Sequence, residues 1–90
     1  MSHRLMLSAA SLIKDQRKLR NQTQEDLAAN SGLDRTYISG VERGTRNITL
    51  DSLEQIVLAL RIPLDAFVSQ WGDQLKAEKV ERKHGAKNAS

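Results

Sequence analysis

The segment that decides the fold spans residues 24–43 and reads QEDLAANSGLDRTYISGVER. It predicts two short helices joined by a turn of about three or four residues centred on Gly32. Ala28 is small at a point where a larger side chain would push the second helix away, and Gly32 suits a left-handed backbone. The apolar residues that can hold the two helices crossed at a steep angle are Leu27, Leu33, Ile38 and Val41. Together these spacings predict a helix-turn-helix motif.

Helices are expected on both sides of this motif, because capping residues and apolar periodicity continue outward from it. A first helix should start between residues 4 and 9 and end near residue 20, where Asn21 tolerates the left-handed conformation. Its apolar face is expected to contain Leu5, Ala9, Leu12, Ile13, Gln16 and Leu19. Thr23 and Asp34 are the expected N-caps of the two helices of the motif.

The same signals predict a fourth and a fifth helix after the motif. Thr49 should cap the fourth helix, and Ile48 should pack on Leu53 as a hydrophobic staple. Pro63 suits the first position of the fifth helix. The expected apolar stripe of the fourth helix consists of Leu50, Leu53, Ile56, Val57 and Leu60. The predicted fold class is therefore all-α, a compact five-helix bundle.

Composition agrees with one small helical domain. The chain has 90 residues, of which 39% are hydrophobic and 28% charged, and this length leaves little room for a second domain. The absence of cysteine excludes disulfides, thiolate metal ligands and cysteine nucleophiles. The predicted division is a helix-turn-helix domain in residues 1–75 and a flexible charged tail in residues 76–90.

The formal net charge of +3 comes from the predicted tail. Residues 76–90 contain five basic and two acidic side chains (5 − 2 = +3), whereas residues 1–75 contain nine of each. The domain is therefore neutral overall. Any binding to nucleic acid must come from where the charges are placed within the domain, and not from their sum.

The second helix of the motif exposes residues that suit a DNA groove. If its apolar residues are buried, its outward side carries Arg35, Thr36, Ser39 and Arg43. Arg35 lies at the N-terminal end, which reaches base edges in the major groove, and it can bind guanine O6 and N7 with about 1–3 kcal/mol of discrimination. Thr36 and Ser39 can meet a base edge, but they are equally compatible with plain surface. Gly40 would let the helix lie close to the groove.

Polar residues around the motif fit contacts to phosphate. A cluster beside the N-terminus of the fourth helix, a favourable place for an anion, consists of Arg43, Arg46, Asn47, Thr49 and Ser52. Gln24 stands at the start of the second helix and could reach another phosphate. Tyr37 is compatible with a core position and with a contact to DNA. Glu42 is acidic on this surface, and Arg17 is its expected partner.

At these residues the sequence resembles a known family. The strings TQEDLA (23–28), GL (32–33), YIS (37–39) and VERG (41–44), with the helix capped by Thr49, resemble the Cro/cI-type (Xre) helix-turn-helix repressors over about residues 8–70. LDRTYISGVER (33–43) followed by RNIT (46–49) is similar to the controller proteins of bacterial restriction–modification systems. The family usually has glycine where this chain has Asn21-Gln22, and its minimal regulators need no tail as long as residues 76–90.

The resemblance implies a lambda-repressor-like DNA-binding domain and a role for each matching position. Bases would be contacted by Arg35, Thr36, Ser39 and Arg46. Phosphates would be contacted by Gln24, Tyr37, Arg43, Asn47 and Ser52. Arg17 and Glu42 match an ion pair typical of the family. Such controllers are small dimeric regulators in the bacterial cytoplasm, at the nucleoid, and they bind paired operators ahead of their own gene and the endonuclease gene.

A homodimer on a palindromic double-stranded operator is also expected on physical grounds. One recognition helix covers too few base pairs to compete against genomic DNA, whereas a two-fold dimer reads half-sites roughly 34–36 Å apart. The apolar face of the fifth helix, predicted as the dimer interface, contains Leu64, Phe67, Val68 and Trp71. Leu64 and Phe67 could instead complete the monomer core. RNA polymerase is kept as a further candidate partner.

Other functional classes find less support in the sequence. The only histidines are His3 and His84, near the ends of the chain, and no paired carboxylates converge on a plausible pocket. We therefore expect no catalytic residues, metal or cofactor, no small-molecule ligand, and no membrane partner, since no stretch approaches the roughly 20 apolar residues of a membrane helix. An antitoxin of a toxin–antitoxin pair, a phage-type repressor and a protein–protein adaptor remain alternatives. Whether genes are activated or repressed is open.

Overall fold

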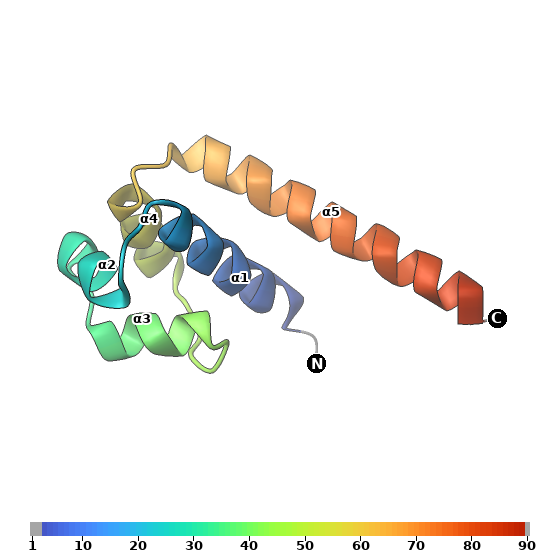
Figure 1. The fold of residues 1–90 in the computed structure, drawn as a ribbon, viewed down its shortest axis with the longest axis horizontal. Coiled ribbons are helices and arrows are strands. Elements are labelled where there is room, and N and C mark those ends of the chain that lie inside the picture. Colours follow the sequence, from blue (N-terminus) through green and yellow to red (C-terminus); the bar gives the residue numbers. More distant parts are fainter. Residues whose placement is uncertain (1–2, 90) are drawn as a thin grey trace.

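The computed structural model describes the backbone of residues 3–89 and the side chains of residues 3–78. Within these limits it contains five helices and no strand: α1 (Arg4–Leu19), α2 (Gln24–Ser31), α3 (Arg35–Glu42), α4 (Leu50–Ala59) and α5 (Leu64–Ala89). Figure 1 shows α3 and α5 on opposite sides of α1, with α2 and α4 closing one end of the bundle. This arrangement leaves one side of α3 open to solvent. The predicted all-α five-helix fold is confirmed.

The core is aliphatic apart from one phenylalanine, as expected from a chain with few aromatic residues. All five helices contribute residues to it, and so does the turn between α4 and α5. Its members are Leu12, Ile13, Leu27, Ile38, Val41, Leu53, Ile56, Val57, Leu60, Ile62 and Phe67. Three residues predicted on apolar faces are instead exposed: Leu5 at 62%, Leu19 at 72% and Leu50 at 82%. Each stands in the first turn or at the last residue of its helix.

Capping interactions set the starts of α2 and α4. The Thr23 hydroxyl accepts from the Asp26 N–H while the Asp26 carboxylate accepts from the Thr23 N–H, which completes a capping box. Thr49 accepts in the same way from the Ser52 N–H at 3.0 Å. The prediction for Asp34 is wrong in part, since it occupies the N-cap position of α3 but its side chain makes no cap hydrogen bond.

Two turns use left-handed backbone where the sequence predicts it. Gly32, between α2 and α3, has a φ of 75°, and Asn21, after α1, has a φ of 56°. Pro63 lies one position earlier than expected, because α5 begins at Leu64 and the Phe67 N–H donates to the Pro63 carbonyl. Pro63 therefore stands at the position just before α5, where its carbonyl accepts the first hydrogen bond of the helix.

The fifth helix requires a correction to the predicted dimer interface. Phe67 is only 1% exposed and packs in the monomer core, with its ring centroid 6.0 Å from that of Trp71. Its side chain is therefore unavailable to a partner, because it is already buried in the apolar core, where α5 packs against α1 and α4. Leu64 and Val68 are exposed at 41% and 60%, and Trp71 is half-buried.

The helical backbone also continues past residue 75, where the sequence predicts the domain to end. Residues 76–89 are helical, not irregular, and they extend α5 beyond the bundle (Figure 1). Alanine and long charged side chains have high helix propensity, so the helix has no local reason to stop at residue 75. No helix among the described residues is both long and apolar enough to span a membrane.

Candidate nucleic-acid interface

The exposed side of α3 carries the residues predicted to read bases. Arg35 and Thr36 are exposed at its first turn, and Ser39 is half-buried one turn further on. The Arg35 Nε lies 3.1 Å from the Glu25 Oε2 of α2, in an ion pair whose side chains are 57% and 67% exposed. Water screens such a pair strongly. Arg35 can therefore exchange Glu25 for another acceptor at little cost.

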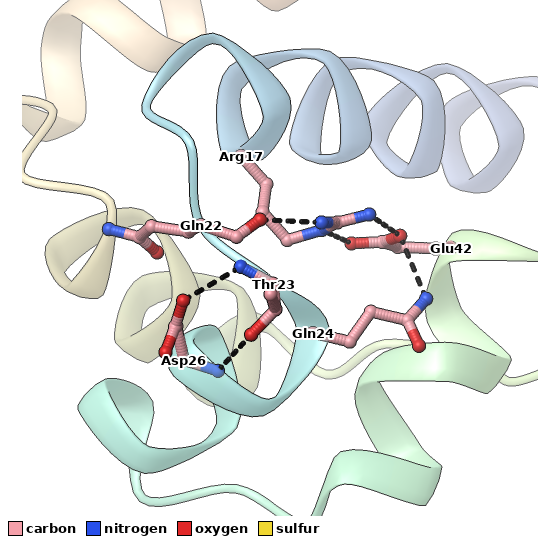
Figure 2. Close-up of polar contacts among 6 residues, drawn as sticks. All are labelled: Arg17, Gln22, Thr23, Gln24, Asp26 and Glu42. Carbon is pink, nitrogen blue, oxygen red and sulfur yellow. Dashed lines mark hydrogen bonds and ion pairs between the residues drawn. The ribbon is translucent and has the colours of Figure 1, made fainter.

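A buried ion pair fixes α3 against α1 from behind. The Arg17 Nε and Nη2 donate to the two Glu42 carboxylate oxygens at 2.6 and 2.9 Å, and the side chains are only 9% and 2% exposed (Figure 2). The Arg17 Nη1 donates to the Gln22 carbonyl at 2.7 Å. The hydrogen bonds and negative charge of Glu42 raise the pKa of Arg17 above its ordinary value. The negative charge of Glu42, which lies near the predicted DNA surface, is thus compensated by the buried guanidinium of Arg17.

Gln24 belongs to the same network. Its Nε2 donates to the Glu42 Oε1 at 3.1 Å, so the amide is oriented by the carboxylate that Arg17 also binds (Figure 2). An amide nitrogen has a second hydrogen to donate. The arrangement therefore holds Gln24 at the start of α2 with one donor still available.

The segment after α3 folds back onto the helix through one carbonyl. The Gly40 oxygen accepts from the Thr45 N–H at 2.9 Å, from the Arg46 N–H at 3.2 Å and from the Thr45 hydroxyl at 3.2 Å. The Arg46 guanidinium then lies over the Tyr37 ring, 5.2 Å from its centroid, and the Tyr37 hydroxyl donates to the Asn47 carbonyl at 3.3 Å. Tyr37 is half-buried: it packs against the core, while its ring and hydroxyl contact Arg46 and Asn47.

The expected role of Gly40 needs correction. The sequence predicts that this glycine lets α3 approach a groove, but Gly40 is buried and faces its own chain. A Cβ built there would lie 2.3 Å from the Arg46 Cγ and 3.2 Å from the Arg46 Cβ. The space that the missing side chain leaves is therefore filled by Arg46.

The remaining predicted phosphate contacts lie near the end of α3 and the start of α4. Arg43 is exposed and its Nη1 donates to the Ser39 hydroxyl, one turn back along α3. Asn47 is exposed, and Ser52 stands in the first turn of α4, where its hydroxyl accepts from Thr49 at 3.0 Å. Ser52 stands among the first N–H groups of α4, and such groups at a helix N-terminus attract anions. Among the described residues, no group of three or more potential metal ligands is close enough to hold an ion.

A shallow apolar hollow of about 240 Å³ lies beside this region, between the starts of α1 and α4 and the first third of α5. Its lining includes Leu5, Leu50 and Trp71, and the Trp71 Nε1 is buried without a hydrogen-bond partner. The sequence places Leu5 and Leu50 on the apolar faces of their helices and does not predict this exposed apolar surface. Periodicity marks both leucines as apolar but does not show that no helix covers them.

Comparisons with known proteins agree with this geometry. Residues 13–67 match the family HTH_3, described as Helix-turn-helix. The chain is 55% identical over 42 residues to control protein C.BamHI of Bacillus amyloliquefaciens, a match that covers 47% of this chain and 52% of that protein. It is 40% identical over 63 residues to control protein C.SmaI of Serratia marcescens, covering 70% and 75%. The crystal structure of the restriction–modification controller protein C.Esp1396I tetramer with its natural 35 base-pair operator superposes with a TM-score of 0.78 at 41% identity, covering 83% and 97%.

Proposed function

Because this chain belongs to the HTH_3 family of helix-turn-helix proteins, we propose that it is a dimeric, sequence-specific transcriptional regulator of its own gene and of a restriction–modification operon. Relatives named control proteins and a controller structure with operator DNA support this function. The observation that carries it is the exposed first turn of α3, with Arg35 and Thr36 presented on a helix anchored from behind by the Arg17–Glu42 pair.

In the proposed complex, the first turn of α3 enters the major groove. Arg35 releases Glu25 and binds a guanine through its two-pronged guanidinium, with about 1–3 kcal/mol of discrimination. Thr36 and Ser39 contact neighbouring base edges. Arg46, whose guanidinium lies over the Tyr37 ring, contacts a further base. This exchange is favoured because Arg35 is exposed and because water screens its ion pair with Glu25, so that the pair is weak.

Phosphate contacts on both sides of α3 would fix its register on the duplex without reading sequence. Gln24 at the start of α2 can donate its second amide hydrogen to one phosphate. The other contacts come from Tyr37, Arg43, Asn47 and Ser52. Since Glu42 orients Gln24, the buried Arg17–Glu42 pair would position this phosphate contact in addition to stabilising the fold.

A second copy of this chain is the proposed occupant of the hollow that Leu5, Leu50 and Trp71 line. Asn47 lies both on this lining and in the segment that carries Arg46, so the hollow adjoins the proposed DNA surface. A two-fold axis there would hold two α3 helices on one face of DNA, as half-sites one helical turn apart require. Val68 and Leu64 remain exposed candidates for an alternative interface.

Sedimentation of two serine variants separates these interfaces. Leu50→Ser should weaken self-association at least tenfold, because it places a hydroxyl against an apolar partner surface, while Val68→Ser should leave it unchanged. The reverse pattern would assign the interface to the outer face of α5. A wild-type protein that stays monomeric at high micromolar concentration would contradict the dimer altogether.

We further propose that the protein has no catalytic activity and works at the bacterial nucleoid, with RNA polymerase as a further partner. The concentration of the protein itself would regulate its binding to the operator. Dimerisation and operator occupancy both rise with concentration, so no ligand is needed for such a response. A small molecule that changes operator affinity would contradict this proposal.

A gel-shift titration tests the function as a whole. Wild-type protein is titrated against DNA from upstream of its own gene and against a scrambled fragment of equal length, at about 0.15 M salt because phosphate contacts are salt-dependent. Arg35→Ala should lose most of the preference for the upstream fragment. Lys76→Ala is the control, since it removes one positive charge at an exposed position of α5. This helix lies on the other side of α1 from α3 (Figure 1). Equal weak binding to both fragments would contradict sequence-specific regulation.

A further inference from the structure

We propose that Gly40 is a positioning residue for Arg46, and that through Arg46 it determines how well the protein discriminates between DNA sequences. The proposal rests on the proposed function, in which Arg46 contacts DNA. Gly40 itself is buried beneath the side chain of Arg46 and would touch no base.

Backbone conformation does not explain this glycine. The glycines of the described chain with a positive φ are Gly32 and Gly44, whereas Gly40 has the ordinary helical backbone of α3. Any residue could adopt that backbone, and glycine destabilises a helix interior relative to alanine. In a helix of only eight residues this cost needs a compensating packing reason.

The packing reason is the stem of Arg46. The atoms that a Cβ at position 40 would meet, at 2.3 and 3.2 Å, are the Arg46 Cγ and Cβ, which lie next to the backbone and not at the flexible end of the side chain. Relief of that clash would require the stem or the main chain to move. The main chain is restrained, since the Gly40 carbonyl accepts from both the Thr45 and the Arg46 N–H groups.

The consequence reaches the guanidinium. With its stem seated on Gly40, Arg46 spans to the Tyr37 ring and lies 5.2 Å from the ring centroid. A long side chain held at both its stem and its head loses less rotamer freedom when it binds a ligand. Gly40 therefore prepares Arg46 for DNA, and a side chain at this position would displace Arg46 from Tyr37.

Gly40→Ala tests the proposal, with Gly72→Ala as the matched control. Gly72 is also a helical glycine, but a Cβ there meets nothing within 4 Å. Gly40→Ala should lower the ratio of operator to scrambled-DNA affinity about tenfold, within the range of one base contact, and Gly72→Ala should leave it unchanged. In the free protein, the ring-current shifts of the Arg46 side-chain protons in NMR spectra should disappear in Gly40→Ala and persist in Gly72→Ala.

The double variant Gly40→Ala/Arg46→Ala shows whether the effect passes through Arg46. If it does, Gly40→Ala has no further effect on discrimination in the Arg46→Ala background. This comparison also holds if Gly40→Ala alone folds poorly, because removal of the Arg46 Cγ relieves the closest contact.

Three results would overturn the proposal. Wild-type discrimination in Gly40→Ala would overturn it while leaving the proposed function intact. An equal loss in both backgrounds would reduce Gly40 to a structural role. A wild-type protein that does not distinguish operator from scrambled DNA would overturn the proposed function, and this inference with it.

Discussion

Among single residues, Arg17 and Glu42 are the most constrained pair of charges in the described chain. Both side chains are almost fully buried, and they share two hydrogen bonds. Burial removes both charges from water, so each depends on the other for compensation. The pair also orients Gln24 and thereby links the core to the proposed phosphate surface.

Arg17→Met should reduce the free energy of unfolding by about 3–5 kcal/mol, because it leaves the Glu42 carboxylate buried without a counter-ion. Urea denaturation followed by circular dichroism measures this loss. The control is Glu25→Gln, which breaks the exposed pair with Arg35 and should cost less than about 1 kcal/mol. Similar losses for the two variants would contradict the role assigned to burial.

Asp26 should make stability depend on pH on the acid side. Hydrogen bonds from Thr23 lower the pKa of Asp26 in the folded protein, so its contribution is complete above the unfolded pKa of about 3.9. The contribution is lost as the pH falls through the lower folded pKa. Asp26→Asn keeps an acceptor for the Thr23 N–H but does not titrate. The stability difference between wild type and Asp26→Asn, measured by denaturation at pH 6 and pH 2.5, should therefore be smaller at the lower pH.

At the scale of elements, the helices begin in two different ways. α2 and α4 start with threonine caps whose hydroxyls accept backbone hydrogen bonds. α3 starts at Asp34 without such a bond, and its position comes from packing and from the Arg17–Glu42 pair. The proposed recognition helix thus depends on tertiary contacts more than its neighbours do.

Cap deletion tests this difference. Thr49→Ala should lower the free energy of unfolding by about 1 kcal/mol, because an N–H at the start of α4 loses its acceptor. Asp34→Ala should cost less than about 0.5 kcal/mol, since no cap hydrogen bond is removed. Thermal or urea denaturation measures both. A larger effect at Asp34 would mean that its carboxylate stabilises α3 in another way.

For the whole molecule, α5 decides how the bundle is closed. Phe67 packs among the aliphatic core residues, and hydrogen bonds from Gln16 to Gln70 and from Gln74 to the Ser8 carbonyl join α5 to α1. The first half of α5 is therefore part of the domain, while the backbone from residue 76 onward extends past it (Figure 1).

Phe67→Ala should cost about 3–5 kcal/mol, because a fully buried ring is replaced by a cavity. Small domains have only about 5–15 kcal/mol of stability in total, so this variant should melt at a much lower temperature. Leu19→Ala, at a leucine that is 72% exposed, is the control and should cost less than about 1 kcal/mol. A small loss at Phe67 would contradict its position in the monomer core.

The helix-turn-helix motif and the order of the five helices follow from signals in the sequence. Its signals are local: Thr23 and Thr49 mark helix starts, and Gly32 marks a left-handed turn. Capping and backbone strain act within a few residues, so they can be read from neighbours in the chain. The Arg17–Glu42 pair, 25 positions apart, is predicted for two other reasons: an acidic residue on the expected DNA surface calls for a cation, and the two residues match an ion pair of the family that the sequence resembles.

The packing of the helices against one another sets which apolar residues are covered and what Gly40 accommodates. Periodicity assigns Leu50 and Phe67 to apolar faces alike, yet Leu50 is 82% exposed and Phe67 is 1% exposed. The difference depends on which helix lies opposite each residue, and no pattern along one helix contains that information. In the same way, the seat of Arg46 on Gly40 exists only because the chain after α3 folds back onto it.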